Sequence, residues 1–215
     1  MDKPKDNVNI TFTSDFICPW CFVAERRLRA VAKDSGISLS VSYQPYELNP
    51  TMPAAGINRK IYRSTKFGSW EKSMALDAGT IEAAAEDPVE FNYDKILTTP
   101  NTRNAHRLVW FVGRHFPETL PDLVDRMFEG YFSSGIDIGN IDALATLAAK
   151  VGLDHDAVLA LLRSDEGTKE LIALEREAID KGVRGVPHIQ IGDAYLYGAE
   201  SAERMRLALQ AAANS

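Results

Sequence analysis

Cys18 and Cys21 are the residues whose type and spacing indicate chemistry. They are the only cysteines in 215 residues, and only Pro19 and Trp20 separate them. A Cys-x-x-Cys spacing allows a local disulfide and is typical of redox sites. The alternative is a buried structural pair of cysteines, and the surrounding pattern favours the redox site over it.

The elements on either side of the motif would position the two thiols. Apolar and polar residues alternate over residues 8–13, which predicts a strand, and residues 24–32 carry apolar side chains on one helical face. Pro19 suits the first position of that helix, where a missing N–H costs nothing. The unpaired N–H groups and partial positive charge of a helix start favour a thiolate. We therefore predict that Cys18 is the exposed attacking thiol and that Cys21, about one turn further on, is the resolving thiol.

Composition excludes several classes of function. Hydrophobic residues make up 45% of the chain and charged residues 25%, and the net charge is −6, which argues against a nucleic-acid partner. No run of about 18 apolar residues would cross a membrane. Residues 1–7 are polar and lack the apolar segment of a secretory signal, so we expect a cytoplasmic protein. The sequence does not indicate an oligomeric state.

The remaining pattern predicts an α/β fold with a mixed sheet. Residues 37–44 alternate as a second strand, which would be parallel to the first because a helix connects them. Residues 49–100 are expected to form mostly helices and loops, and several helices follow up to about residue 181. A hairpin around Gly192 and a last helix capped by Ser201 end the chain. We expect a sheet domain built from residues 1–52 and 166–215, with residues 53–165 as an all-helical insertion.

These features resemble the DsbA-type thioredoxin-fold oxidoreductases, and most closely their cytosolic FrnE-like branch. The resemblance covers nearly the whole chain except about residues 57–92. It rests on the segments Asp15-x-x-Cys18-Pro19-Trp20-Cys21, Glu47-Leu48-Asn49-Pro50, Asn101-Thr102-x-x-Ala105-His106-Arg107, Tyr131-Phe132 with Gly135-x-Asp137-Ile138, Gly182-Val183-x-Gly185-Val186-Pro187 and Gly198-Ala199.

The resemblance implies a thioredoxin-like fold and a second half of the site. It implies that the Val186–Pro187 bond is cis and lies against the two thiols. The backbone of Val186 would then pair with an extended substrate, and Pro19 and Trp20 would complete the substrate-binding surface. Trp20 would offer apolar surface beside Cys18, which suits an apolar or peptide-like partner.

Four further residues carry open alternatives. His188 stands where a threonine is common in this family, and it would either stabilise the Cys18 thiolate or point to the other face of its strand, which alternation favours. Asn101, His106 and Arg107 would either face the thiols and bind substrate or glutathione, or serve as a helix cap and solvated surface.

The leading functional hypothesis is a thiol–disulfide oxidoreductase that acts on disulfide-containing proteins or small-molecule thiols. No resident cofactor or metal is expected, although glutathione could be a co-substrate. One alternative is a glutathione-dependent isomerase or transferase, of the 2-hydroxychromene-2-carboxylate isomerase or kappa type. These resembling enzymes usually carry a serine in place of Cys18, so the two cysteines argue against it. The other alternative is a metal-binding or chaperone-like module, although Cys18 and Cys21 supply only two of the usual four zinc ligands.

Overall fold

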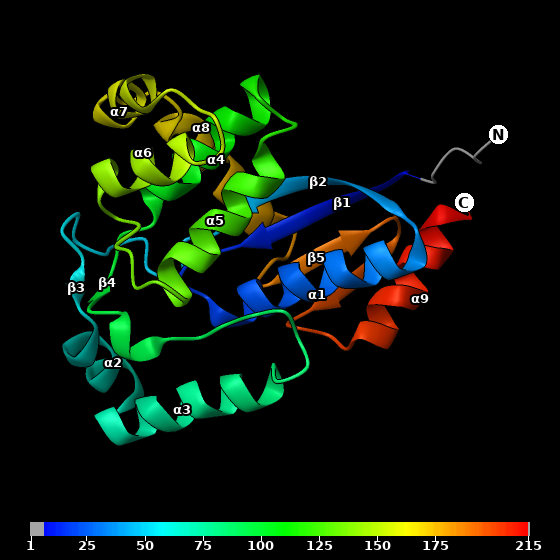
Figure 1. The fold of residues 1–215 in the computed structure, drawn as a ribbon, viewed down its shortest axis with the longest axis horizontal. Coiled ribbons are helices and arrows are strands. Elements are labelled where there is room, and N and C mark those ends of the chain that lie inside the picture. The colour runs from blue at the N-terminus through cyan, green and yellow to red at the C-terminus, as the bar shows by residue number, and fades with distance from the viewer. Residues whose placement is uncertain (1–6, 215) are drawn as a thin grey trace.

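The computed structural model describes residues 7–214 and has a four-stranded mixed sheet at its centre (Figure 1). The polar segment 1–6, which bears on the expected absence of a secretory signal, lies outside the described residues. The strands are β1 (Asn7–Ser14), β2 (Ser38–Pro45), β5 (His188–Ile191) and β6 (Ala194–Tyr197). Their order is β2-β1-β5-β6, with β1 parallel to β2 and antiparallel to β5, and β5 antiparallel to β6. The predicted α/β class and mixed sheet are confirmed.

Two helices cover one face of this sheet. Helix α1 (Pro19–Ser35) crosses from β1 to β2 and ends at Gly36, whose φ of 67° lies in the left-handed region that favours glycine. Helix α9 (Ala202–Ala213) packs beside α1, and the Ser201 side chain caps it by accepting a hydrogen bond from the Arg204 N–H. Alternation places the apolar side chains of β1 and β5 on this face, where they pack against both helices.

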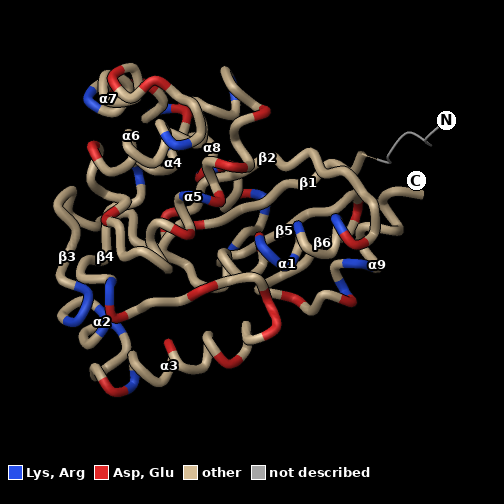
Figure 2. The backbone as a smooth tube through the Cα atoms, viewed as in Figure 1, with Lys and Arg blue, Asp and Glu red and all other residues tan. Residues whose placement is uncertain are grey.

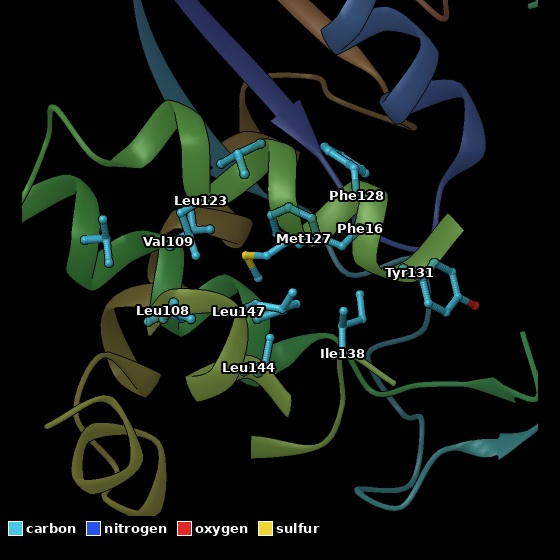
Figure 3. Packing of buried hydrophobic residues seen from close by; sticks show 14 of the residues in the cluster. Phe16, Leu108, Val109, Leu123, Met127, Phe128, Tyr131, Ile138, Leu144 and Leu147 are labelled. Atoms are coloured by element: carbon cyan, nitrogen blue, oxygen red, sulfur yellow. The ribbon is translucent and has the colours of Figure 1, made fainter. Parts of the chain in front are cut away.

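A group of helices packs around the other end of β1 and forms a second core. These helices are α4 (Arg103–His115), α5 (Leu120–Phe132), α6 (Ile141–Ala149) and α7 (His155–Arg163), while α8 (Thr168–Asp180) lies against α4 and β2. Figure 3 shows side chains of α4, α5 and α6 meeting Phe16, which follows β1. Helix α8 begins at Thr168, directly after Gly167, whose φ of +79° lies in the left-handed region that favours glycine. The C-terminal end of β1 is thus anchored in this helical core.

The segment from residue 49 to residue 100 holds α2 (Arg59–Phe67) and α3 (Trp70–Ala83), in agreement with the helices and loops expected there. It also holds two strands that the sequence analysis missed, β3 (Ile57–Asn58) and β4 (Thr98–Thr99), which pair antiparallel. The expected all-helical insertion is therefore corrected: two-residue strands are too short to show alternation. Gly56 allows the chain before β3 to lie close to β4, since a Cβ at this position would lie only 2.8 Å from the Thr99 carbonyl oxygen.

Within residues 7–214, no helix has the length and apolar character needed to cross a membrane.

Candidate active site

The two cysteines occupy the first turn of α1, as the sequence predicts. Cys18 is the residue before the helix, with extended backbone angles, and Pro19 takes the first helical position. The Cys18 N–H donates to the Asp15 carbonyl at 3.0 Å, and the Cys18 carbonyl accepts from the Cys21 N–H at 3.0 Å. This tight turn holds Cys18 and Cys21 side by side as free thiols.

The exposure of Cys18 differs from the prediction. We expected an exposed attacking thiol, yet Cys18 is only 5% exposed and Cys21 is fully buried. The reason is cover from segments far along the chain, because α1 alone would leave its first residue open. Trp20, which is 39% exposed, is the residue of the motif that solvent reaches best.

Part of this cover comes from Val186. The Cys18 Sγ lies 3.7 Å from the Val186 carbonyl oxygen and donates a weak hydrogen bond to it. The peptide bond between Val186 and Pro187 is cis. Pro187 is buried, and its carbonyl accepts from the Gly198 N–H at 2.9 Å, which ties the loop to the end of β6. The structure thus brings Val186 and Cys18 together.

Asp15 lies next to Cys21 and contacts His106. Both are buried, and the His106 Nε2 lies 3.4 Å from the Asp15 Oδ1, while the Asp15 Oδ2 accepts from the Leu48 N–H at 2.7 Å. Burial above all raises the pKa of the Cys21 thiol, and the neighbouring Cys18 thiol and the Asp15 charge raise it further. Cys21 is therefore held as a neutral thiol at neutral pH.

A pocket of about 470 Å³ opens beside Cys18. The motif itself lines it through Cys18, Pro19 and Trp20, and the facing walls come from α2, α3 and the end of α5. Its size suits a small molecule or a short peptide segment. Its further lining residues are Ile17, Leu48, Asn49, Arg59, Tyr62, Arg63, Lys66, Phe67, Ala75, Leu76, Asp77, Gly79, Thr80, Tyr93, Ile96, Thr99, Tyr131 and Phe132.

Two of the other expected site residues have structural roles instead. Asn101 Nδ2 donates to the Met52 carbonyl at 2.7 Å, and its Oδ1 accepts from the Arg103 N–H, so it joins the loop after β2 to the start of α4. Arg107 is neither substrate-facing nor solvated, which corrects both alternatives. It is buried, and its guanidinium donates to carbonyls at the end of α7 and in the turn after it, those of Leu161, Leu162, Ser164 and Glu166.

His188 lies on the sheet face away from α1. Its ring packs against Tyr195 and Tyr197, with ring centres 5.7 and 5.0 Å apart, and it shares a depression with residues of α8. This is the orientation that strand alternation favours. Burial lowers the pKa of His188, which keeps the ring neutral at neutral pH.

Within residues 7–214, no three His, Cys, Asp or Glu side chains converge closely enough to hold a metal ion. The two thiols and the pocket beside them can support disulfide exchange with a bound sulfur compound.

The sequence profile described as a DSBA-like thioredoxin domain matches residues 9–210. The chain belongs to this family. A solved structure of a probable DsbA oxidoreductase from Streptomyces coelicolor is similar to this DsbA-like chain, with a TM-score of 0.84 and 25% identity, and the match covers 97% of this chain and 91% of the other.

Two curated relatives of this DsbA-like chain have similar lengths. An uncharacterized protein of Bacillus subtilis, YwbO, is 28% identical over 89% of this chain and 90% of its own. A 2-hydroxychromene-2-carboxylate isomerase of Sphingobium xenophagum is 26% identical over 88% of this chain and 91% of its own. The family therefore includes both oxidoreductases and isomerases.

The pocket wall formed by α2 was missed by the sequence analysis. Arg59, Arg63 and Lys66 follow at intervals of four and three residues, a spacing that places them on one face of a helix. That spacing could have indicated a basic surface. It could not have indicated that the surface faces Cys18, because the chain from β2 to α2 runs through irregular loops.

Proposed function

We propose that this DsbA-like protein is a thiol–disulfide oxidoreductase that acts through Cys18 and Cys21. The observation that carries the proposal is the placement of the dithiol: Cys18 starts α1 at the edge of a pocket, and Cys21 lies buried one turn behind it. A first sulfur that borders a pocket, beside a second one that is fully buried, suits a two-step exchange.

The exchange balances in two steps. The Cys18 thiolate attacks one sulfur of a substrate disulfide, a mixed disulfide forms, and the first substrate thiolate leaves. Cys21 then loses its proton and attacks the Cys18 sulfur, which releases the second substrate thiolate and closes the Cys18–Cys21 disulfide. Two electrons and two protons pass from the protein to the substrate, and the reverse sequence oxidises a dithiol.

Trp20, Pro19, Val186 and Pro187 would form the surface that receives the substrate. Trp20 is exposed beside Cys18, and the Val186 carbonyl already lies against the Cys18 sulfur. We place this activity in the cytoplasm, because two cysteines in the whole chain leave no structural disulfide framework of the kind that oxidising compartments favour. Proteins with disulfides, or small thiols such as glutathione, would be its partners, with no resident cofactor.

A redox titration against glutathione tests this function. In buffers of increasing glutathione disulfide, the wild-type protein should lose two hydrogen atoms as the Cys18–Cys21 bond forms. Cys18→Ser should not react, and Cys21→Ser should stop at a protein–glutathione mixed disulfide, both visible by intact mass. A wild-type dithiol that stays reduced in excess glutathione disulfide would contradict the proposal.

The relative named as an isomerase favours a second candidate, a glutathione-dependent isomerase or transferase. Such a reaction needs one bound thiol but no resolving cysteine. Isomerisation of a 2-hydroxychromene-2-carboxylate with glutathione, at a rate that Cys21→Ser leaves intact, would support this candidate over disulfide exchange.

A further inference from the structure

The pocket wall that faces the dithiol is basic. Arg59, Arg63 and Lys66 of α2 all line it, together with Cys18 and Trp20 from the opposite side. In Figure 2, blue segments gather on α2, at the end of the molecule where β3 and β4 lie. The chain as a whole carries a net charge of −6, so this wall is a local reversal of sign.

The acidic groups at the wall do not neutralise it. Asp77 bridges two guanidiniums, with its Oδ2 2.7 Å from Arg59 and its Oδ1 2.8 Å from Arg63. Of the described residues that line the pocket, Asp77 is the one acid, against three cations. The Lys66 Nζ contacts neutral groups instead, the Tyr62 hydroxyl at 2.8 Å and the Asn49 Oδ1 at 3.3 Å. The wall therefore keeps an excess of two positive charges.

Two buried polar groups line the same pocket. Within residues 7–214, the Asn49 Nδ2 is buried and has no partner with hydrogen-bond geometry, and the Tyr93 hydroxyl is buried next to Thr80. Burial raises the pKa of Tyr93, so its hydroxyl keeps the proton that it can donate. Buried donors without acceptors are costly, and an anionic acceptor from a ligand would satisfy them.

We propose that the α2 wall makes the site selective for small thiols and disulfides that carry a carboxylate. The carboxylate would bind at Lys66 and Arg63, with Asn49 and Tyr93 as further donors, while the sulfur reaches Cys18. This inference rests on the proposed disulfide exchange and names its substrate class. A pocket of about 470 Å³ accommodates such a molecule, and Trp20 and Tyr131 give its carbon chain apolar contact.

Three small disulfides of matched length test the selectivity. The probes are 3,3′-dithiodipropionate, which is anionic, bis(2-hydroxyethyl) disulfide, which is neutral, and cystamine, which is cationic. Each oxidises the reduced wild-type protein under pseudo-first-order conditions at low ionic strength, and the readout is the ratio of the anionic to the neutral rate. We expect the order anionic, neutral, cationic from fastest to slowest, with a preference that added salt reduces.

Lys66→Glu should lower the anionic-to-neutral ratio about fivefold, and Lys66→Met about twofold. Lys66 is exposed at the pocket rim, so neither change threatens the fold. Lys60→Glu makes the same charge change on α2 outside the pocket lining and should leave the ratio at the wild-type value.

The outcomes separate the selectivity from the activity on which it rests. Equal ratios in wild type and Lys66→Glu, with all probes reacting, overturn the carboxylate selectivity and leave disulfide exchange standing. An equal fall of the anionic-to-neutral ratio in Lys60→Glu also overturns the carboxylate selectivity, because the long-range charge of the protein would then explain the preference for the anionic probe. A wild-type dithiol that reacts with none of the probes overturns both proposals.

Discussion

The sulfur of Cys18 lies 3.7 Å from the carbonyl oxygen of Val186, a residue 168 positions further along the chain. This contact joins the start of α1 to the loop before β5, and it contributes to the low exposure of Cys18. An S–H···O contact is weak, so in the proposed disulfide exchange a substrate would displace it at little cost. The carbonyl that covers the thiol at rest is thereby a hydrogen-bond acceptor next to the reacting sulfur.

The reduced protein should lose stability in alkaline solution because of Cys21. Burial, with Cys18 and Asp15, raises the pKa of Cys21 above its ordinary value of 9.0 in the folded state only. Above that pH the unfolded state binds fewer protons than the folded state, so the free energy of unfolding falls as pH rises. The stabilisation from the neutral Cys21 thiol is complete below the pKa of Cys21 in the unfolded chain, and it is lost as the pH rises through the pKa of Cys21 in the folded protein. Between these two pKa values, the free energy of unfolding falls by no more than about 1.4 kcal/mol per pH unit.

Urea unfolding of the reduced protein between about pH 8 and about pH 10.5 measures this slope. Cys21→Ser is the matched control, because Ser does not ionise there and the buried tyrosines Tyr43 and Tyr131 contribute equally to both proteins. Identical slopes for the two proteins would show that Cys21 does not ionise differently on folding.

Arg107→Met should destabilise the protein by about 3 kcal/mol, because it leaves the carbonyls at the end of α7 without their donor. Arg163→Met is the control on the same region, since that side chain is 64% exposed and should cost less than about 0.5 kcal/mol. Urea unfolding gives both values. An Arg107→Met protein of wild-type stability that exchanges disulfides slowly would instead favour the substrate-binding role that the structure argues against.

Gly135→Ala should cost at least about 2 kcal/mol more than Gly152→Ala. Both glycines have positive φ, 70° and 89°, so both substitutions carry the strain of that conformation. A Cβ at Gly135 would collide with the Lys95 carbonyl, whereas Gly152 has open space around it. The difference between the thermal or urea midpoints of the two variants measures the cost of the collision. Equal losses of stability would show that the turn at Lys95 moves to accommodate the added Cβ at little cost.

The sequence predicts the part of the site that lies on elements with a regular pattern of apolar residues. Alternation before Cys18 and helical spacing after Cys21 place the dithiol at a strand-to-helix junction, and the structure has it there. The parallel pairing of β1 with β2 followed from the connecting helix, and the β5–β6 hairpin from its turn residues.

The rest depends on contacts between segments far apart in sequence. The burial of Cys18 depends on Val186 and on the pocket walls, neither of which a local pattern indicates. Arg107 was expected at the surface or at the thiols, and its contacts with carbonyls emerge only once the end of α7 lies beside α4. Arg63 lies on α2, which loops separate from the central sheet, so no local pattern places it beside Cys18.

The contact between Cys18 and Val186 has a consequence for synthesis on the ribosome. Chains grow from the N-terminus at about 5–20 residues per second, so the dithiol is made on the order of ten seconds before the residue 168 positions later that helps to cover it. During that interval both sulfurs belong to an incomplete sheet that lacks β5 and β6. In a nascent chain, both thiols are therefore open to thiols and disulfides of the surroundings before the segment that covers Cys18 exists.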